Sequence, residues 1–155
     1  MKIVLIIIPI LILASFVGFF VLGLMSQSGE ANGLVGGKLT KCPDKPNCVC
    51  TEFNADIDHY IDPVDFSQTT TAITLSRLKN SIEEMGGNIR TENDNYLAAT
   101  FTSSFFRFVD DLEIRVDMEQ NLIHMRSASR VGHSDRGVNR KRVERLKNLY
   151  KMKIS

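Results

Sequence analysis

The chain has 155 residues, of which 43% are hydrophobic, and its 19 Lys and Arg residues nearly balance its 18 Asp and Glu residues. This length accommodates one domain with its own core. The charge is unevenly placed, because the segment from Arg136 to Lys153 is strongly basic. That segment lacks the interleaved aromatic residues of a base-stacking platform, so we expect no nucleic-acid partner.

The first residues predict a membrane-spanning helix. The run Ile3–Leu24, IVLIIIPILILASFVGFFVLGL, carries no charge, and at about 1.5 Å per residue it would cross a hydrocarbon core of about 30 Å. A cleaved signal peptide is the alternative, but the run exceeds the usual apolar core of about 7–15 residues and no small-x-small site follows it cleanly. We assign residues 1–25 to a transmembrane anchor that contacts the lipid bilayer through residues 3–24.

Residues 26–38 are rich in glycine, serine and asparagine and have too few apolar side chains to build a core. This composition predicts a flexible linker between the membrane and the domain. The folded domain is then expected over residues 39–155.

Cysteines mark the start of this domain. Cys42 and Cys48 enclose the short loop PDKPN, and a disulfide between them would favour an oxidising compartment; a reduced or otherwise paired set is the alternative. We therefore expect the domain outside the cytoplasm, in the periplasm or at the cell surface. Cys42, Cys48 and Cys50 with His59 could form a metal site, but C-x5-C-x-C is not a familiar zinc spacing, so we expect no metal and no cofactor.

Hydrophobic spacing predicts two helices and an antiparallel sheet. Apolar residues recur every three to four positions over Gln68–Met85, where Ser67 is a candidate N-cap, and again over Asp135–Met152. Between these segments the period changes to two. The predicted strands lie near Ile89–Thr91 and over Tyr96–Thr102, Asp110–Asp117 and Leu122–Ser129. The order indicates an α+β two-layer domain, with an antiparallel sheet of about four strands and two flanking helices.

Strand alternation places charges on the second face of this sheet. Opposite the apolar residues of the last two strands lie Asp111, Glu113, Arg115, His124 and Arg126. The simpler interpretation is a set of exposed cross-strand ion pairs, each contributing about 0.2–1 kcal/mol. The alternative is a charged groove.

The stretch Ser127–Arg142, SASRVGHSDRGVNRKR, is the candidate functional site. One interpretation is structural: a carboxylate at Asp110 or Asp111 pairs with an arginine at 126 or 130. Ser134 or Asp135 would then cap the final helix. In this interpretation the stretch stabilises the fold and binds nothing.

The second interpretation is functional. Arginines, serines and the free amides at the helix start could bind a phosphate, a carboxylate or a lipid head group. Ser, His and Asp are also the residue types of a hydrolase, but no G-x-S-x-G elbow occurs and neighbouring residues rarely point at one centre, so no catalytic residue is assigned. The candidate ligand-binding residues are Arg126, Ser127, Ser129, Arg130, His133, Ser134, Asp135, Asn139 and Arg140.

Three blocks of the sequence resemble a known family. These are CPDKPNCV at Cys42–Val49, FRFVDDLEIRVD at Phe106–Asp117 and IHMRSASRVGHSDRGVNRKRVERL at Ile123–Leu146. Together they are similar to the family catalogued as domain of unknown function 1499 (DUF1499). The resemblance implies a bacterial or plastid-related protein, often with an N-terminal membrane or export segment, and it supplies no activity that can be carried over to this chain. Where the family usually has a serine pair after PNCV, this chain has Cys50 and Thr51.

These observations predict a membrane-anchored, extracytoplasmic module that binds an anionic small molecule, a lipid head group or a membrane protein partner. One alternative is a small hydrolase or transferase that uses the polar loop Ser127–Asn139. A second alternative is a structural assembly factor for another membrane protein.

Overall fold

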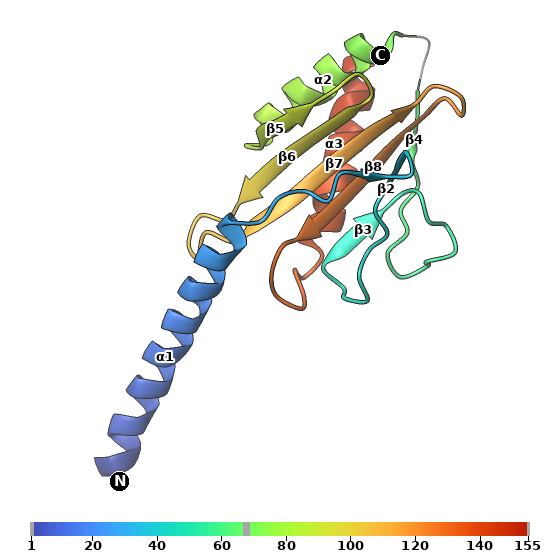
Figure 1. The fold of residues 1–155 in the computed structure, drawn as a ribbon. Helices are drawn as coiled ribbons and strands as arrows, with labels where there is room; N and C mark the ends of the chain where they lie inside the picture. The colour runs from blue at the N-terminus through green and yellow to red at the C-terminus, as the bar shows by residue number, and fades with distance from the viewer. Residues whose placement is uncertain (1, 67–68, 155) are drawn as a thin grey trace.

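The computed structural model describes residues 2–66 and 69–154 of the chain. Its first element is the helix α1 (Lys2–Gln27), which extends away from one end of the folded domain (Figure 1). The part Ile6–Gln27 is long and apolar enough to cross a membrane. The predicted N-terminal apolar helix is therefore confirmed; a helix of this kind near the N-terminus is either a membrane anchor or a signal sequence.

The domain has the predicted α+β class. Among the described residues its main sheet has six strands in the order β3-β8-β7-β6-β5, with β4 also paired to β8, and neighbouring strands run antiparallel. The sequence predicted about four strands, because β3 and β4 have three and two residues, too few to show an alternating pattern. The strands are β3 (Cys48–Cys50), β4 (Val64–Asp65), β5 (Asn88–Glu92), β6 (Tyr96–Thr102), β7 (Val109–Asp117) and β8 (Leu122–Ser129).

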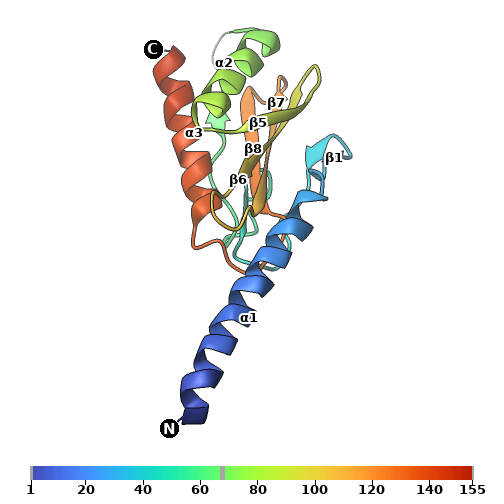
Figure 2. The same ribbon diagram turned by 90° about the vertical axis from the view of Figure 1, so that its left-hand side faces the viewer.

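Two helices, α2 (Thr71–Glu84) and α3 (Val138–Ile154), cover one face of the sheet (Figure 2). The predicted cap Ser67 lies outside the described residues, and the hydroxyl of Thr70 accepts a hydrogen bond from the amide of Ile73 at the start of α2. Alternate residues of the strands pack against the helices, as the sequence period requires. The fully buried side chains of this core include Leu78, Ile82, Leu97, Leu112, Ile114, Ile123, Met125, Val143, Leu146 and Tyr150.

The second face of the sheet is covered by residues 28–42, which we call the strap. It contains the hairpin of β1 (Leu34–Val35) and β2 (Lys38–Leu39), which lies on the side of the sheet away from α2 and α3 (Figure 2). A second apolar cluster packs between the strap, the disulfide region and the sheet. Its buried members are Leu39, Cys42, Cys48, Cys50, Tyr96, Ala98 and Ala128.

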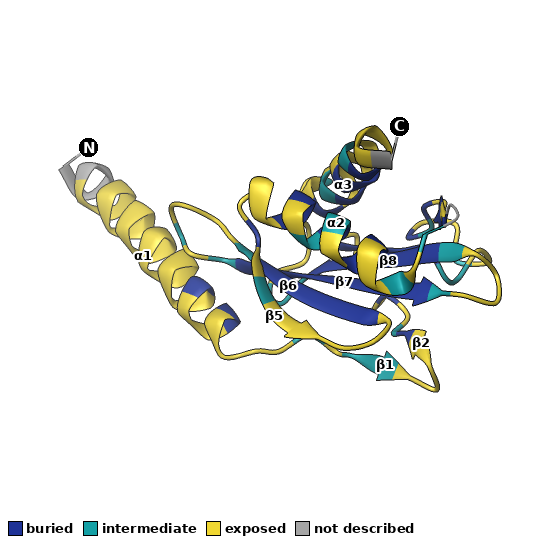
Figure 3. Cartoon of the chain, turned by 90° about the horizontal axis from the view of Figure 1, so that it is seen from above, coloured by how far each residue is buried: buried dark blue, intermediate teal, exposed yellow. Residues whose placement is uncertain are grey.

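The strap corrects two predictions. The flexible linker expected over residues 26–38 is wrong, because the amide of Gly33 donates a hydrogen bond to the Glu113 carboxylate and Leu34 packs against the second cluster. The exposed ion pairs expected on this face are also wrong, since Glu113 is 0% and Arg126 4% exposed. Strands β6, β7 and β8 are accordingly mostly buried (Figure 3). Composition suggested a linker because the strap is held on the sheet by the backbone amide of Gly33 and by few apolar side chains.

Candidate functional site

The structure divides the candidate residues between the two faces of the sheet. Ser127, Ser129 and Asn139 form hydrogen bonds with one another on the side of α3. Arg126 and Arg130 lie on the strap side, where they pair with carboxylates of β7. The polar stretch of the sequence is therefore not one site.

On the helix side, Asn139 is the centre of a hydrogen-bond network. Its Oδ1 accepts from the Ser127 hydroxyl at 2.6 Å and also from Arg142, and its Nδ2 donates to the carbonyl of Asn47 at 2.9 Å. The Arg142 guanidinium donates to Asp110 at 2.7 Å. These bonds join α3 to the ends of β3, β7 and β8, and they use the polar atoms that a ligand would need.

The loop before α3 has a structural role at most of its polar positions. The Asp135 carboxylate accepts from the amides of Gly137 and Asn139, at 3.0 and 2.6 Å, and so caps α3. The Ser134 hydroxyl accepts from the amide of Arg136. The Arg140 guanidinium donates to two carbonyls in the loop between β3 and β4, those of Tyr60 and Asp58.

His133 and Ser127 do not form a catalytic pair. The imidazole of His133 is exposed, whereas Ser127 is 0% exposed and its hydroxyl is bonded within the Asn139 network. A nucleophile and its base must lie within hydrogen-bond reach of each other and of the substrate. This geometry gives the hydrolase interpretation no support.

On the strap side, the buried Arg126 and the half-buried Arg130 hold two buried carboxylates. The Arg130 guanidinium donates two hydrogen bonds to Asp111, at 2.8 and 2.7 Å, in a fork. The Arg126 Nη1 donates to Glu113 at 2.7 Å, and the Tyr96 hydroxyl donates to the other oxygen of that carboxylate at 2.9 Å. Paired in this way, the charges tolerate burial under the strap.

The surroundings shift the pKa values of these groups in directions that favour the pairing. Hydrogen bonds to the Asp111 carboxylate raise the pKa of Arg130 despite its partial burial. Burial, together with the neighbouring Glu113 carboxylate, raises the pKa of Tyr96. The phenol therefore stays protonated and remains a hydrogen-bond donor at neutral pH.

Two cavities flank the strap. The smaller, which we call the strap cavity, has a volume of about 400 Å³, and its charged lining residues are Glu30, Lys41, Asp111, Arg126 and Arg130. The larger, about 690 Å³, lies toward β5 and β6. Both are lined by Gly29, Glu30, Asp111 and Arg130, so the first residues of the strap separate them. Volumes of this size are typical of small-molecule sites.

Arg126, which lines the strap cavity, carries an unsatisfied donor. Arg126 has a side chain 5% exposed, and its Nε has no hydrogen-bond partner among the described residues. A buried polar group without a partner costs about 1–3 kcal/mol. A residue that lines a cavity and carries such a group is a candidate for binding an acceptor.

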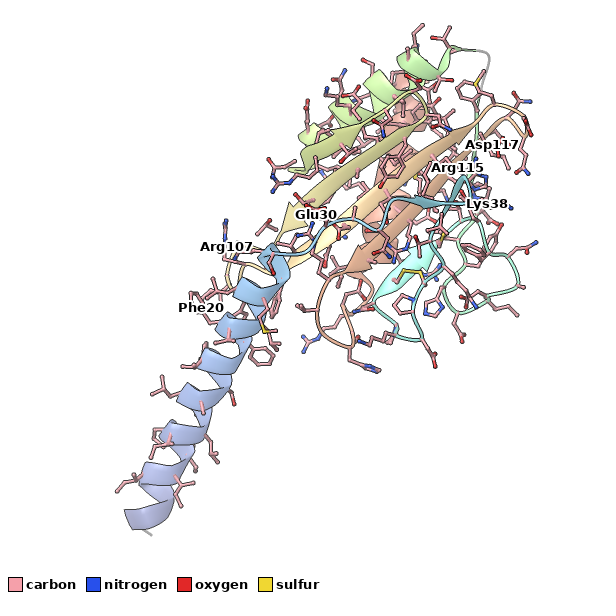
Figure 4. The ribbon with its side chains drawn as sticks, in the orientation of Figure 1. Phe20, Glu30, Lys38, Arg107, Arg115 and Asp117 are labelled. Atoms are coloured by element: carbon pink, nitrogen blue, oxygen red, sulfur yellow. A yellow bond between two sulfur atoms is a disulfide. The ribbon has the colours of Figure 1, made fainter. Side chains whose placement is uncertain are left out.

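A second charge cluster lies at the far end of the same face. Arg115 donates to Glu52 at 2.6 Å and to Asp117 at 3.0 Å. Beside them His124 accepts or donates a 3.1 Å hydrogen bond with the Thr51 hydroxyl, and burial lowers the pKa of its imidazole. Figure 4 places Arg115, Asp117 and Lys38 together at this end and Glu30 near the end of α1.

Sequence reasoning identified Arg126 and Arg130 but missed their surroundings. Glu30 and Lys41 lie in or next to the segment that was assigned to a linker, so no pattern pointed to them. Tyr96 could have been identified from the sequence, because it is the first residue of β6 and strand alternation places it on the same face as Ala98.

The cysteines form the predicted disulfide. Cys42 and Cys48 are bonded, and Cys50 is a free, buried thiol whose pKa is raised by burial to about 11. Within residues 2–66 and 69–154 no group of three or more His, Cys, Asp and Glu side chains is placed to hold a metal ion. The disulfide instead fixes the loop that carries Lys41 to the edge strand β3.

The fold and this site define a class: an α+β domain with an N-terminal apolar helix and a strapped, charged sheet face. Residues 38–149 match the family described as "Protein of unknown function (DUF1499)", and the chain belongs to this family. No curated protein and no solved structure matches the chain.

Proposed function

We propose that the protein is a membrane-anchored, extracytoplasmic module that binds a phosphate-type anion in the strap cavity. The unpartnered Nε of the buried Arg126 carries this proposal. Guanidinium groups bind phosphate oxygens through paired N–H donors, and Arg126 uses its Nη1 on Glu113. The Nε donor is left for a ligand.

The cations of the cavity lining each have a carboxylate partner. Arg130 is paired with Asp111 and Arg126 with Glu113, and Lys41 lies 3.7 Å from Asp56. Support for an anionic ligand therefore comes from the free donor of Arg126 and not from an excess of cations.

Contacts between α1 and the domain support retention of the helix as an anchor. Ser26 is 1% exposed, its hydroxyl accepts from the amide of Val109, and its carbonyl accepts from Arg130. A signal peptide destined for removal needs no such bonds to the mature domain. The Cys42–Cys48 disulfide supports an oxidising, extracytoplasmic location.

The ligand has two candidate sources, since a phosphate group occurs both in solution and on lipid head groups. The cavity begins at Gly29 and Glu30, directly after the apolar helix ends at Gln27. This position is close to the depth at which head groups lie when the helix spans a bilayer. We therefore favour the head group of an anionic lipid.

The test measures binding of inorganic phosphate by isothermal titration calorimetry, with the full chain in phosphatidylcholine nanodiscs. We expect Arg126→Lys to weaken binding at least about tenfold, because lysine keeps a cation beside Glu113 but has no Nε donor. Arg115→Lys is the matched control, because Arg115 is a buried arginine of the same sheet face that lines neither cavity. It should bind phosphate like the wild type.

Nanodiscs containing phosphatidylglycerol separate the two sources. If the head group occupies the cavity, phosphate binding will weaken in these discs; if free phosphate is the ligand, it will not change. Absence of phosphate binding in phosphatidylcholine discs, or equal losses in the two arginine variants, would refute the proposal.

A further inference from the structure

The loop between β6 and β7, residues 103–108, has the sequence SSFFRF and so carries three phenylalanines. It is closed by two hydrogen bonds: the amide of Ser103 donates to the carbonyl of Phe108, and the amide of Phe108 donates to the Ser103 hydroxyl. At its tip Phe105 is 73% exposed. An ordered loop that presents an aromatic ring outward is typical of an interaction surface.

This loop packs on the apolar helix. The ring of Phe106 lies 5.3 Å from that of Phe19 and 6.0 Å from that of Phe16, and the ring of Phe105 lies 6.4 Å from that of Phe16. A Cβ atom at Gly23 would lie 1.7 Å from the carbonyl oxygen of Phe106. Glycine at this position therefore allows the loop to approach the helix closely.

The contacts place the two rings well inside the apolar span. Phe16 lies about three turns before the end of α1 at Gln27, a distance of about 16 Å along the helix axis. The hydrocarbon core is about 30 Å thick, so a ring in contact with Phe16 is below the head groups even when the helix is tilted.

We infer that residues 103–108 enter the outer half of the bilayer beside α1, with Phe105 and Phe106 among the acyl chains. Arg107 follows them with a left-handed backbone (φ +61°), and Figure 4 shows it beside the C-terminal end of α1, with Phe20 further along the helix. At that level its guanidinium reaches the lipid phosphates, as basic residues at membrane boundaries do.

This second attachment fixes the orientation of the domain. One spanning helix leaves a domain free to tilt and rotate, whereas a helix and an adjacent inserted loop hold it on the membrane surface. The end of the sheet that carries Asp111 and Arg130 is then held toward the head groups, because β7 begins at the end of this loop. The inference shares with the proposed function only the retained helix.

The test uses tryptophan fluorescence, because the chain has no tryptophan. Phe105→Trp would introduce a single indole at the loop tip, in the full chain reconstituted in phosphatidylcholine vesicles. We expect blue-shifted emission, at least about half of it quenched by lipids brominated on their acyl chains, and little quenching by aqueous iodide. The control is Met118→Trp, at the exposed β7–β8 turn on the opposite end of the sheet, which iodide should quench and bromolipids should not.

Iodide quenching of the Phe105→Trp variant equal to that of the control would overturn the inference. Emission that neither reagent quenches would also overturn it, since the loop would then be covered by this domain or by a second copy of the chain. Ser104→Cys with a nitroxide label gives a second measurement, in which oxygen should relax the spin more than a water-soluble nickel complex does. Neither readout depends on phosphate, so failure here is distinguishable from failure of the cavity proposal.

Discussion

His124 shows how the strap changes the chemistry of a single residue. The Thr51 hydroxyl accepts a hydrogen bond from the amide of Met125 and shares a second hydrogen bond with the Nδ1 of His124. Burial of the imidazole lowers its pKa and so favours the neutral form. Burial lowers its pKa most, Arg115 and Lys38 lower it further, and Glu52 and Asp117 oppose them.

This environment predicts a pH dependence of stability. Because the folded pKa of His124 lies below its unfolded value of about 6.5, the unfolded chain binds more protons as the pH falls below that value. The free energy of unfolding should decrease from about pH 7 to about pH 5. His124→Gln should flatten this slope, measured by thermal unfolding at several pH values. His133→Gln, at an exposed position, should leave it unchanged; equal slopes in all three proteins would contradict the assignment.

The residues of the strap side illustrate the limit of sequence reasoning at this scale. Alternation correctly separates Asp110, on the apolar side, from Asp111 and Glu113. The Arg130–Asp111 pair is one of the pairings expected from the sequence, but the partner of Asp110 is not, because Arg142 reaches it from α3. Long arginine side chains bridge positions that strand register alone does not bring together.

At the scale of secondary-structure elements, the capping of α3 is open to a direct test. Asp135→Ala removes an acceptor for the amides of Gly137 and Asn139, and we expect a loss of about 1 kcal/mol of stability. The lost anchorage of Asn139 would also loosen the network around Ser127. Chemical unfolding of the full chain in detergent micelles measures the change. His133→Ala in the same loop should change stability by less than about 0.5 kcal/mol, and a similar loss in both variants would argue against a cap.

The elements divide into those that periodicity reveals and those that it does not. The helices α2 and α3 bury one regular face each, and the strands β6, β7 and β8 place their aliphatic side chains on alternate positions, so their pattern is visible in the sequence. The strap follows no such period, since it is held by the Gly33 amide and by a hairpin with glycines at positive φ, at Gly36 and Gly37. A glycine-rich composition is found both in flexible linkers and in tight turns, so it does not by itself predict which of the two forms.

At the scale of the whole molecule, the proposed topology predicts a labelling pattern in intact cells. Ile57→Cys introduces a thiol at an 84% exposed position, so a membrane-impermeant maleimide should label this variant if the domain is outside the cytoplasm. The wild type is the built-in blank, because Cys50 is buried and has its pKa raised to about 11.

The same cells test the anchor. The labelled protein should remain in the membrane after an alkaline wash, with an intact mass that includes α1. Labelling only after the cells are permeabilised would contradict the topology, and a mature chain that starts near Ser26 would contradict retention of the helix.

The strap also bears on where a fragment of this protein should begin. The family match starts at residue 38, yet the residues that shield Glu113 and line the cavity around Arg126 include Gly29, Glu30, Asn32 and Gly33. A recombinant fragment cut at the family boundary would leave a buried charged sheet face open to water. A fragment that begins at Ser26 would keep that face covered. The folding unit therefore begins before the family boundary, at the end of α1.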